Sequence, residues 1–331
     1  MDGGARAESQ HSRARGFARW FSWIFGIAML AAVVIAALHF SEEREFVHMA
    51  ERAEPWWMIV AIALQVGTYF AQGESWRVVT RAAGAAVPLG EMFKLSLAKL
   101  FVDQALPSGG ISGTYIVARG LEQRGVARST VMAAIVVDMV SYYGAYVVTL
   151  AAALGIMIVA GHASPVIVAT AVFFLVFSVA FAVVSLALSG RTYRVPVWLQ
   201  RVPVLRQVLA LLATANRELA RSLSLLLKSG GYQLAIVLFD AATVWVLIRA
   251  LGDHASPAGV FASFMISTLI RTVGIVPGGL GIFEAASVLT LKLTGVPVGV
   301  ALAATLLFRG LSFWIPMAPG LIFSRGPRRT G

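Results

Sequence analysis

Residues 277–281, Pro277-Gly278-Gly279-Leu280-Gly281, interrupt an apolar run that extends from Val260 to Leu293. A second interruption, Leu106-Pro107-Ser108-Gly109-Gly110, divides the run Phe93–Leu121. Proline removes a backbone donor and glycine weakens a helix, so each run predicts two helices joined by a break. Each helix is too short for a full crossing, which takes about 20 apolar residues. We therefore expect two re-entrant helical hairpins, with breaks near the midplane of a membrane where protein or water covers the exposed backbone.

The composition supports a membrane environment for these hairpins. The chain has 331 residues, of which 58% are hydrophobic and 13% are charged, and its mean hydropathy is +0.80. Soluble domains average about 45–50% apolar and about 25% charged residues. The composition excludes a disordered chain, a disulfide scaffold and a cytosolic enzyme. Because the chain has no cysteine, disulfides, thiolate metal sites and cysteine nucleophiles are excluded as well.

Six further apolar stretches are long enough to cross the membrane. The first follows four arginines but is too long for a signal-peptide core, so we interpret it as an uncleaved helix. The predicted fold is an all-α polytopic membrane protein with six transmembrane helices and two re-entrant hairpins. The six stretches are Trp20–Phe40, Trp56–Trp76, Thr130–Ala160, Pro165–Leu188, Gly231–Leu251 and Val298–Phe323.

The basic residues predict the orientation of these elements. Most Lys and Arg residues lie in the N-terminal segment 1–19, around the first hairpin, in the linker 190–228 and in the tail 326–331. Basic loops mark the cytoplasmic side, so both termini are expected there, in a bacterial inner membrane. The loop Ser41–Pro55 is acidic and is assigned to the opposite side. The first hairpin then enters from the cytoplasm and the second from outside.

The two hairpins also match in sequence spacing. Pro277 and Pro107 are 170 positions apart (277 minus 107), and so are Gly295 and Gly125. We interpret 56–160 and 231–323 as an inverted repeat within a single transmembrane domain, 20–325, with the coincidence of two similar breaks as the alternative. Inverted repeats are typical of secondary transporters, whose broken helices meet at a midplane site. The linker 190–228 between the repeats predicts amphipathic helices on the cytoplasmic surface.

Ionisable residues inside the spans are expensive and therefore mark candidate sites. We expect a polar cavity between the breaks, in which Arg271 and Arg309 bind a lipid phosphate through their guanidinium groups. Backbone amides at the second break would add donors. Glu284 and Asp138 would hold the arginines when no substrate is bound. The candidate residues are Arg271, Glu284, Arg309, Asp138, Asp240, Pro277, Gly278, Gly279, Gly281, Pro107, Gly109 and Gly110.

A purely structural interpretation of these charges stays open. In that case Arg309 pairs with Asp138, and Arg271 pairs with Glu284. Lys99 and Asp103 lie four residues apart on one helix face, and we expect a local ion pair between them.

The segment 277–284, followed by Gly295-Val296, Arg309, Pro316 and Gly320, resembles the signature of the lysylphosphatidylglycerol synthase transmembrane, or flippase-like, family. The earlier Leu106–Gly110 break is similar to the first break of that family. The resemblance covers roughly residues 20–325. It implies a lipid-translocating domain, here expected as a stand-alone member without the soluble aminoacyl-transferase. Stand-alone members are linked to hopanoid, glycolipid or isoprenoid-lipid handling.

The predicted function is translocation of a lipid with a phosphate or other polar headgroup between leaflets. The alternative is a non-catalytic accessory subunit of a lipid-biosynthesis or export complex; an intramembrane enzyme is a third interpretation that lacks a nucleophile or metal set. We expect no enzyme activity, cofactor, metal or nucleic acid. The expected partners are membrane lipids, either anionic phospholipids or hopanoids, and a second copy of the chain in a homodimer.

Overall fold

The computed structural model describes residues 54–105, 110–189, 213–273 and 277–324. Within these ranges the chain is helical and contains no strand. Four helical segments are long and apolar enough to cross a membrane: Arg128–Val159, Pro165–Leu188, Leu223–Ala250 and Val298–Ser324. The expected first span, the segments 1–19 and 326–331, the linker residues 190–212, and Pro107 and Gly109 lie outside the described residues.

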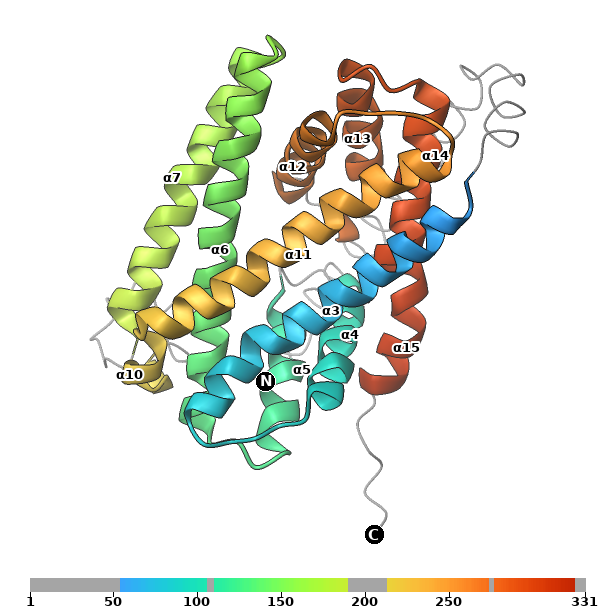
Figure 1. Ribbon diagram of the computed structural model, residues 1–331. Coiled ribbons are helices and arrows are strands. Elements are labelled where there is room, and N and C mark those ends of the chain that lie inside the picture. Colours follow the sequence, from blue (N-terminus) through green and yellow to red (C-terminus); the bar gives the residue numbers. More distant parts are fainter. Residues whose placement is uncertain (1–53, 106–109, 190–212, 274–276, 325–331) are drawn as a thin grey trace, which may run out of the picture.

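The longest pairing in the fold joins α3 (Trp56–Ala82) and α11 (Leu223–Ala250), which run side by side in opposite directions (Figure 1). At one end Glu54 N donates to Ala250 O at 2.9 Å. At the other end the hydroxyls of Ser75 and Ser229 are 2.7 Å apart. The apolar run in the sequence predicted that α11 begins at Gly231. The helix begins earlier because Ser222 O accepts from Leu226 N at 3.0 Å and closes a first turn there.

Helix α3 has the length of a span but is not among the four apolar segments. It carries Gln65, Gln72 and Glu74 along with two arginines, and these lower its mean hydropathy. Helices α11, α4 and α6 pack against α3.

Two broken hairpins occupy opposite ends of the helical body (Figure 1). The first consists of α4 (Leu89–Ala105) and α5 (Ile111–Glu122), the second of α12 (Pro257–Val273) and α13 (Ile282–Leu293). In each hairpin the two helices pack against each other. The described part of the second break contacts the end of α4, because a β-carbon on Gly278 would lie 3.0 Å from Gln104 Oε1.

Two long helices, α6 (Arg128–Val159) and α7 (Pro165–Leu188), stand beside this body (Figure 1). The Ser164 hydroxyl accepts from Ile167 N at 3.3 Å and proline occupies the first position of α7, two features that start helices. With about 1.5 Å per residue, the 32 residues of α6 exceed the ~30 Å thickness of the hydrocarbon.

The last expected span, Val298–Phe323, is bent. It consists of α14 (Val298–Arg309), a π-helical turn η2 (Gly310–Trp314) and α15 (Ile315–Ser324). Pro316 has no N–H to donate to the carbonyl of Ser312 four residues earlier, which favours an irregular turn there. The hydroxyl of Tyr69, from α3, donates to that carbonyl at 2.9 Å.

The bent segment contacts both hairpins. Helix α14 packs against α13, whereas α15 packs against α4. The second contact is close, because any β-carbon on Gly320 would overlap the Leu97 carbonyl. A four-residue helix, α10 (Arg217–Ala220), packs against α6 and α11.

The apolar core has two parts, one around each hairpin. Near the second hairpin it includes Leu247, Met265 and Leu291, and near the first it includes Trp76 and Met92, all of them almost fully buried. The polar residues described next lie among these helices.

Candidate functional site

A buried ion pair links the second break to α14. Arg309 Nε donates to Glu284 Oε1 at 2.7 Å, and the two side chains are 4% and 1% exposed. Glu284 Oε2 accepts from Gly281 N at 2.7 Å, and Arg309 Nη2 donates to Gly278 O at 2.8 Å. The arginine also lies 4.3 Å from the ring centroid of Phe313. The pair therefore joins α14, the break and the start of α13.

This arrangement corrects two sequence predictions. The pairing of Arg271 with Glu284 is wrong, because Glu284 faces α14 and pairs with Arg309. The amide of Gly281, expected as a donor to a phosphate, is already bound by the Glu284 carboxylate. One backbone amide at the start of α13 is thus satisfied internally.

Asp138 lies in a separate polar cluster between α3, α6 and α11. Its Oδ1 accepts hydrogen bonds from Gln72 Nε2 at 3.0 Å, Ser75 Oγ at 2.6 Å and Gln233 Nε2 at 2.6 Å. The predicted pairing of Arg309 with Asp138 is wrong, because Asp138 points toward α3 and α11. Three donors stabilise its negative charge in place of an arginine.

Arg271 differs from Arg309 in having no carboxylate partner at ion-pair distance among the described residues. It lies in the last turn of α12, and its side chain passes so close to Gly279 that a β-carbon there would overlap its Cγ. Its guanidinium is 5.8 Å from the ring centroid of Phe283. Of these two arginines, only Arg309 is held by a carboxylate at ion-pair distance among the described residues.

Asp240 belongs to a further polar contact between α11 and α3. Gln65 Nε2 donates to Asp240 Oδ1 at 2.9 Å and to Thr243 Oγ1 at 3.0 Å. Gln65 is 3% exposed, and its Oε1 has no hydrogen-bond partner among the described residues. Asp240 is therefore linked through Gln65 to α3.

A second ion pair lies near the end of α4, before the first break. Lys99 Nζ lies 2.8 Å from Asp103 Oδ2, which confirms the predicted local pair. Asp103 Oδ1 accepts from Gly113 N at 2.9 Å, near the start of α5. A β-carbon on Gly113 would overlap this carboxylate, so a larger residue there would displace the Asp103 side chain from the amide. Gly110 precedes α5 with a φ of 88°, a conformation that glycine adopts without strain.

Sequence reasoning missed the uncharged partners of these groups. Gln65, Thr68, Gln72 and Ser75 recur along one face of α3. Gln65 and Ser75 contact α11, and Gln72 binds Asp138 of α6. Their spacing of three and four residues within an apolar stretch was the available signal.

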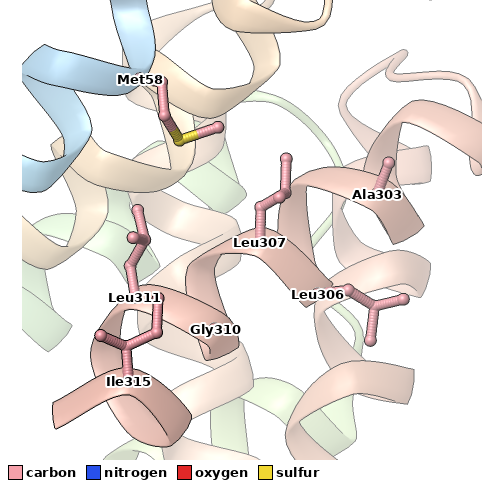
Figure 2. Close-up of a pocket in the computed structure, with 7 residues that line it drawn as sticks. All are labelled: Met58, Ala303, Leu306, Leu307, Gly310, Leu311 and Ile315. Carbon is pink, nitrogen blue, oxygen red and sulfur yellow. The ribbon is translucent and has the colours of Figure 1, made fainter.

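An apolar pocket of about 560 Å³ lies beside the π-helical turn, away from these polar groups (Figure 2). It lies between the start of α3 and the bent last segment of the fold. Its lining residues are Met58, Ala303, Leu306, Leu307, Gly310, Leu311 and Ile315.

The known proteins to which this chain is similar include the following three. A UPF0104 membrane protein of Methanocaldococcus jannaschii is 22% identical over 293 residues, which are 81% of this chain and 84% of the relative. A UPF0104 membrane protein of Methanothermobacter thermautotrophicus is 30% identical over 86 residues, or 26% of this chain and 25% of the relative. The phosphatidylglycerol lysyltransferase of Staphylococcus haemolyticus is 36% identical over 85 residues, or 25% of this chain and 10% of that enzyme.

The match to a family is much longer than the last two alignments. The lysylphosphatidylglycerol synthase TM region matches residues 23–320, which include both broken hairpins, the Glu284–Arg309 pair and Arg271. Together with the apolar helices, this match identifies a multi-pass membrane protein. The chain belongs to the lysylphosphatidylglycerol synthase transmembrane family.

Proposed function

We propose that this protein moves a lipid with a phosphate-bearing headgroup between the two leaflets of a bacterial inner membrane. In this proposal six helices cross the bilayer and the two broken hairpins are re-entrant, with both termini in the cytoplasm. The headgroup passes through the interior polar region while the acyl chains stay in the bilayer. The protein acts without a chemical reaction on the lipid.

The observation that carries the proposal is the position of Arg271. Its side chain lies against Gly279 of the second break, and that break contacts Gln104 of the first hairpin. Arg271 has no carboxylate at ion-pair distance among the described residues, so its guanidinium is free to bind an anion. A guanidinium fork matches the geometry of phosphate oxygens. Family membership and the apolar helices support a lipid as the source of that phosphate.

Arg309 has a different role in this proposal from the one expected from the sequence. It is sealed by Glu284 and the Gly278 carbonyl, so it holds the break in shape and does not bind substrate. Arg271 alone of the two arginines would contact the headgroup.

The test is reconstitution into vesicles of phosphatidylcholine with a trace of phosphatidylglycerol labelled by a nitrobenzoxadiazole dye. Dithionite quenches the dye in the outer leaflet only, so translocation appears as loss of the protected fraction. Arg271→Gln should slow translocation about tenfold or more, because a hydrogen bond to a charged group is worth about 1.5–3 kcal/mol.

Arg249→Gln is the matched control. Arg249 lies near the end of α11, about 6 Å from the ring centroids of Trp57 and Trp245 and away from both breaks. This variant should translocate like the wild type. Equal quenching in protein-free and protein-containing vesicles would reject translocation and favour the accessory-subunit alternative. Translocation that is unchanged in Arg271→Gln would reject the proposed site.

A further inference from the structure

The same arrangement of charged groups lies beside each of the two breaks. In each hairpin a carboxylate accepts a hydrogen bond from a backbone amide at the start of the second helix, and a basic side chain holds that carboxylate. At the second break these groups are Glu284 and Arg309. At the first break they are Asp103 and Lys99.

The two pairs differ in accessibility. The Arg309 and Glu284 side chains are 4% and 1% exposed, whereas those of Lys99 and Asp103 are 28% and 17% exposed. A sealed pair cannot exchange its partner without unfolding its surroundings, because separated charges in the interior are costly. An accessible pair is weaker and can exchange partners. An incoming anion can therefore displace Asp103 from Lys99.

Lys99 belongs to the helix that contacts the second break. Helix α4 packs against residues 277–279, and its Gln104 lies beside Gly278. Arg271 lies beside the next residue, Gly279. The first half-helix of each hairpin thus carries one cation and packs at the second break.

We propose that Lys99 is the second cation of the headgroup site, and that the phosphate lies between Lys99 of one hairpin and Arg271 of the other. This inference rests on the proposed function. The sequence predicted that Arg271 and Arg309 bind the phosphate, and in this proposal Lys99 takes the place of Arg309. Asp103 is the internal competitor of the headgroup: it neutralises Lys99 in the absence of substrate and remains bound to Gly113 N when the phosphate takes the lysine.

The experiment is calorimetric titration of the full chain in detergent with dihexanoyl phosphatidylglycerol. Lys99→Gln should raise the Kd about tenfold, because it removes a charged hydrogen-bond donor. Asp103→Asn should lower the Kd about two- to fivefold, because it removes the competing charge and keeps an oxygen for Gly113 N. The double variant should bind no better than Lys99→Gln.

Opposite signs for the two single variants distinguish this site from a structural ion pair. If the pair only stabilises α4, both variants lose stability together and neither improves binding, which would overturn the inference. Lys94→Gln is the matched control, since Lys94 also lies on α4 and pairs with Glu91 at 2.7 Å, but its side chain is 47% exposed. It should leave the Kd unchanged.

Two further arms separate the possible failures. If Arg271→Gln also binds like the wild type, the proposed function fails together with this inference. If Arg271→Gln weakens binding and Lys99→Gln does not, only the role of Lys99 fails. Dihexanoylglycerol, which lacks the phosphate, should not bind. Inorganic phosphate that binds as tightly as the lipid would support the two-cation site and assign it to a free anion.

Discussion

Replacing Glu284 with glutamine removes one charge from the most deeply buried ion pair among the described residues and keeps the size of the side chain. Arg309 would then be a buried cation without a counter-charge, because glutamine keeps one acceptor oxygen but no negative charge, and the other described acceptor is the neutral Gly278 carbonyl at 2.8 Å. Removing one partner of a buried pair costs about 3–5 kcal/mol. At about 2 °C per kcal/mol for a large domain, the melting temperature should fall by about 6–10 °C.

The measurement is a thermal melt of the purified protein in detergent, followed by its intrinsic tryptophan fluorescence. Glu91→Gln is the matched control, because Glu91 pairs with Lys94 and Arg124 while its side chain is 33% exposed. Exposed pairs contribute about 0–1 kcal/mol each, so the loss of two pairs should lower its melting temperature by about 4 °C or less. The double variant Glu284→Gln/Arg309→Met removes both charges and should recover part of the loss.

A melting temperature of Glu284→Gln within about 1 °C of wild type would refute this reasoning. It would mean that water reaches Arg309 and that the pair is not sealed. Arg309 would then again be a candidate for binding the headgroup.

Three other substitutions test further contacts of the fold. The stability of each variant is measured by the same thermal melt. Tyr69→Phe removes the donor to the Ser312 carbonyl and should lower stability by about 1–3 kcal/mol, with faster amide exchange in the π-helical turn. Gly279→Ala should lose both stability and translocation, because its β-carbon overlaps the Arg271 side chain and its φ is 62°. Asp138→Asn should lower stability by about 1.5–3 kcal/mol and leave the translocation rate of the folded protein unchanged, whereas a lost rate at normal stability would make Asp138 a transport residue.

The breaks could be predicted from sequence because their cause is local. Proline and glycine act on the residue in which they occur, so Pro277 and Gly278 located the second break within one or two residues. The local pair between Lys99 and Asp103 was predictable for the same reason, since four residues on one helix fix the spacing.

The partners of the buried charges were not predictable in the same way. The repeat offset placed Arg309 at the depth of Asp138, but depth does not fix the direction in which a side chain points around its helix. Asp138 points toward α3 and α11, and Glu284 points toward α14. These directions depend on the rotation of each packed helix, which a single sequence does not specify.

Helix α3 is less apolar than the expected span Trp56–Trp76 suggested. Gln65 and Gln72 bind the carboxylates of Asp240 and Asp138, so α3 supplies neutral donors to carboxyl groups carried by other helices. A hydropathy profile counts these side chains as polar, although their amide N–H groups are bound inside the protein.

The segment from Val298 to Ser324 limits how this protein can be divided. Its first part packs on the second hairpin and its last part on the first, with Gly320 against the Leu97 carbonyl. A fragment that ends after α7 would therefore lack the surface that covers α4, even though it contains the whole first hairpin. If the protein were produced as two polypeptides divided in the linker, both would have to be present in the same cell to assemble. Each polypeptide would lack helices that pack against it in the intact protein.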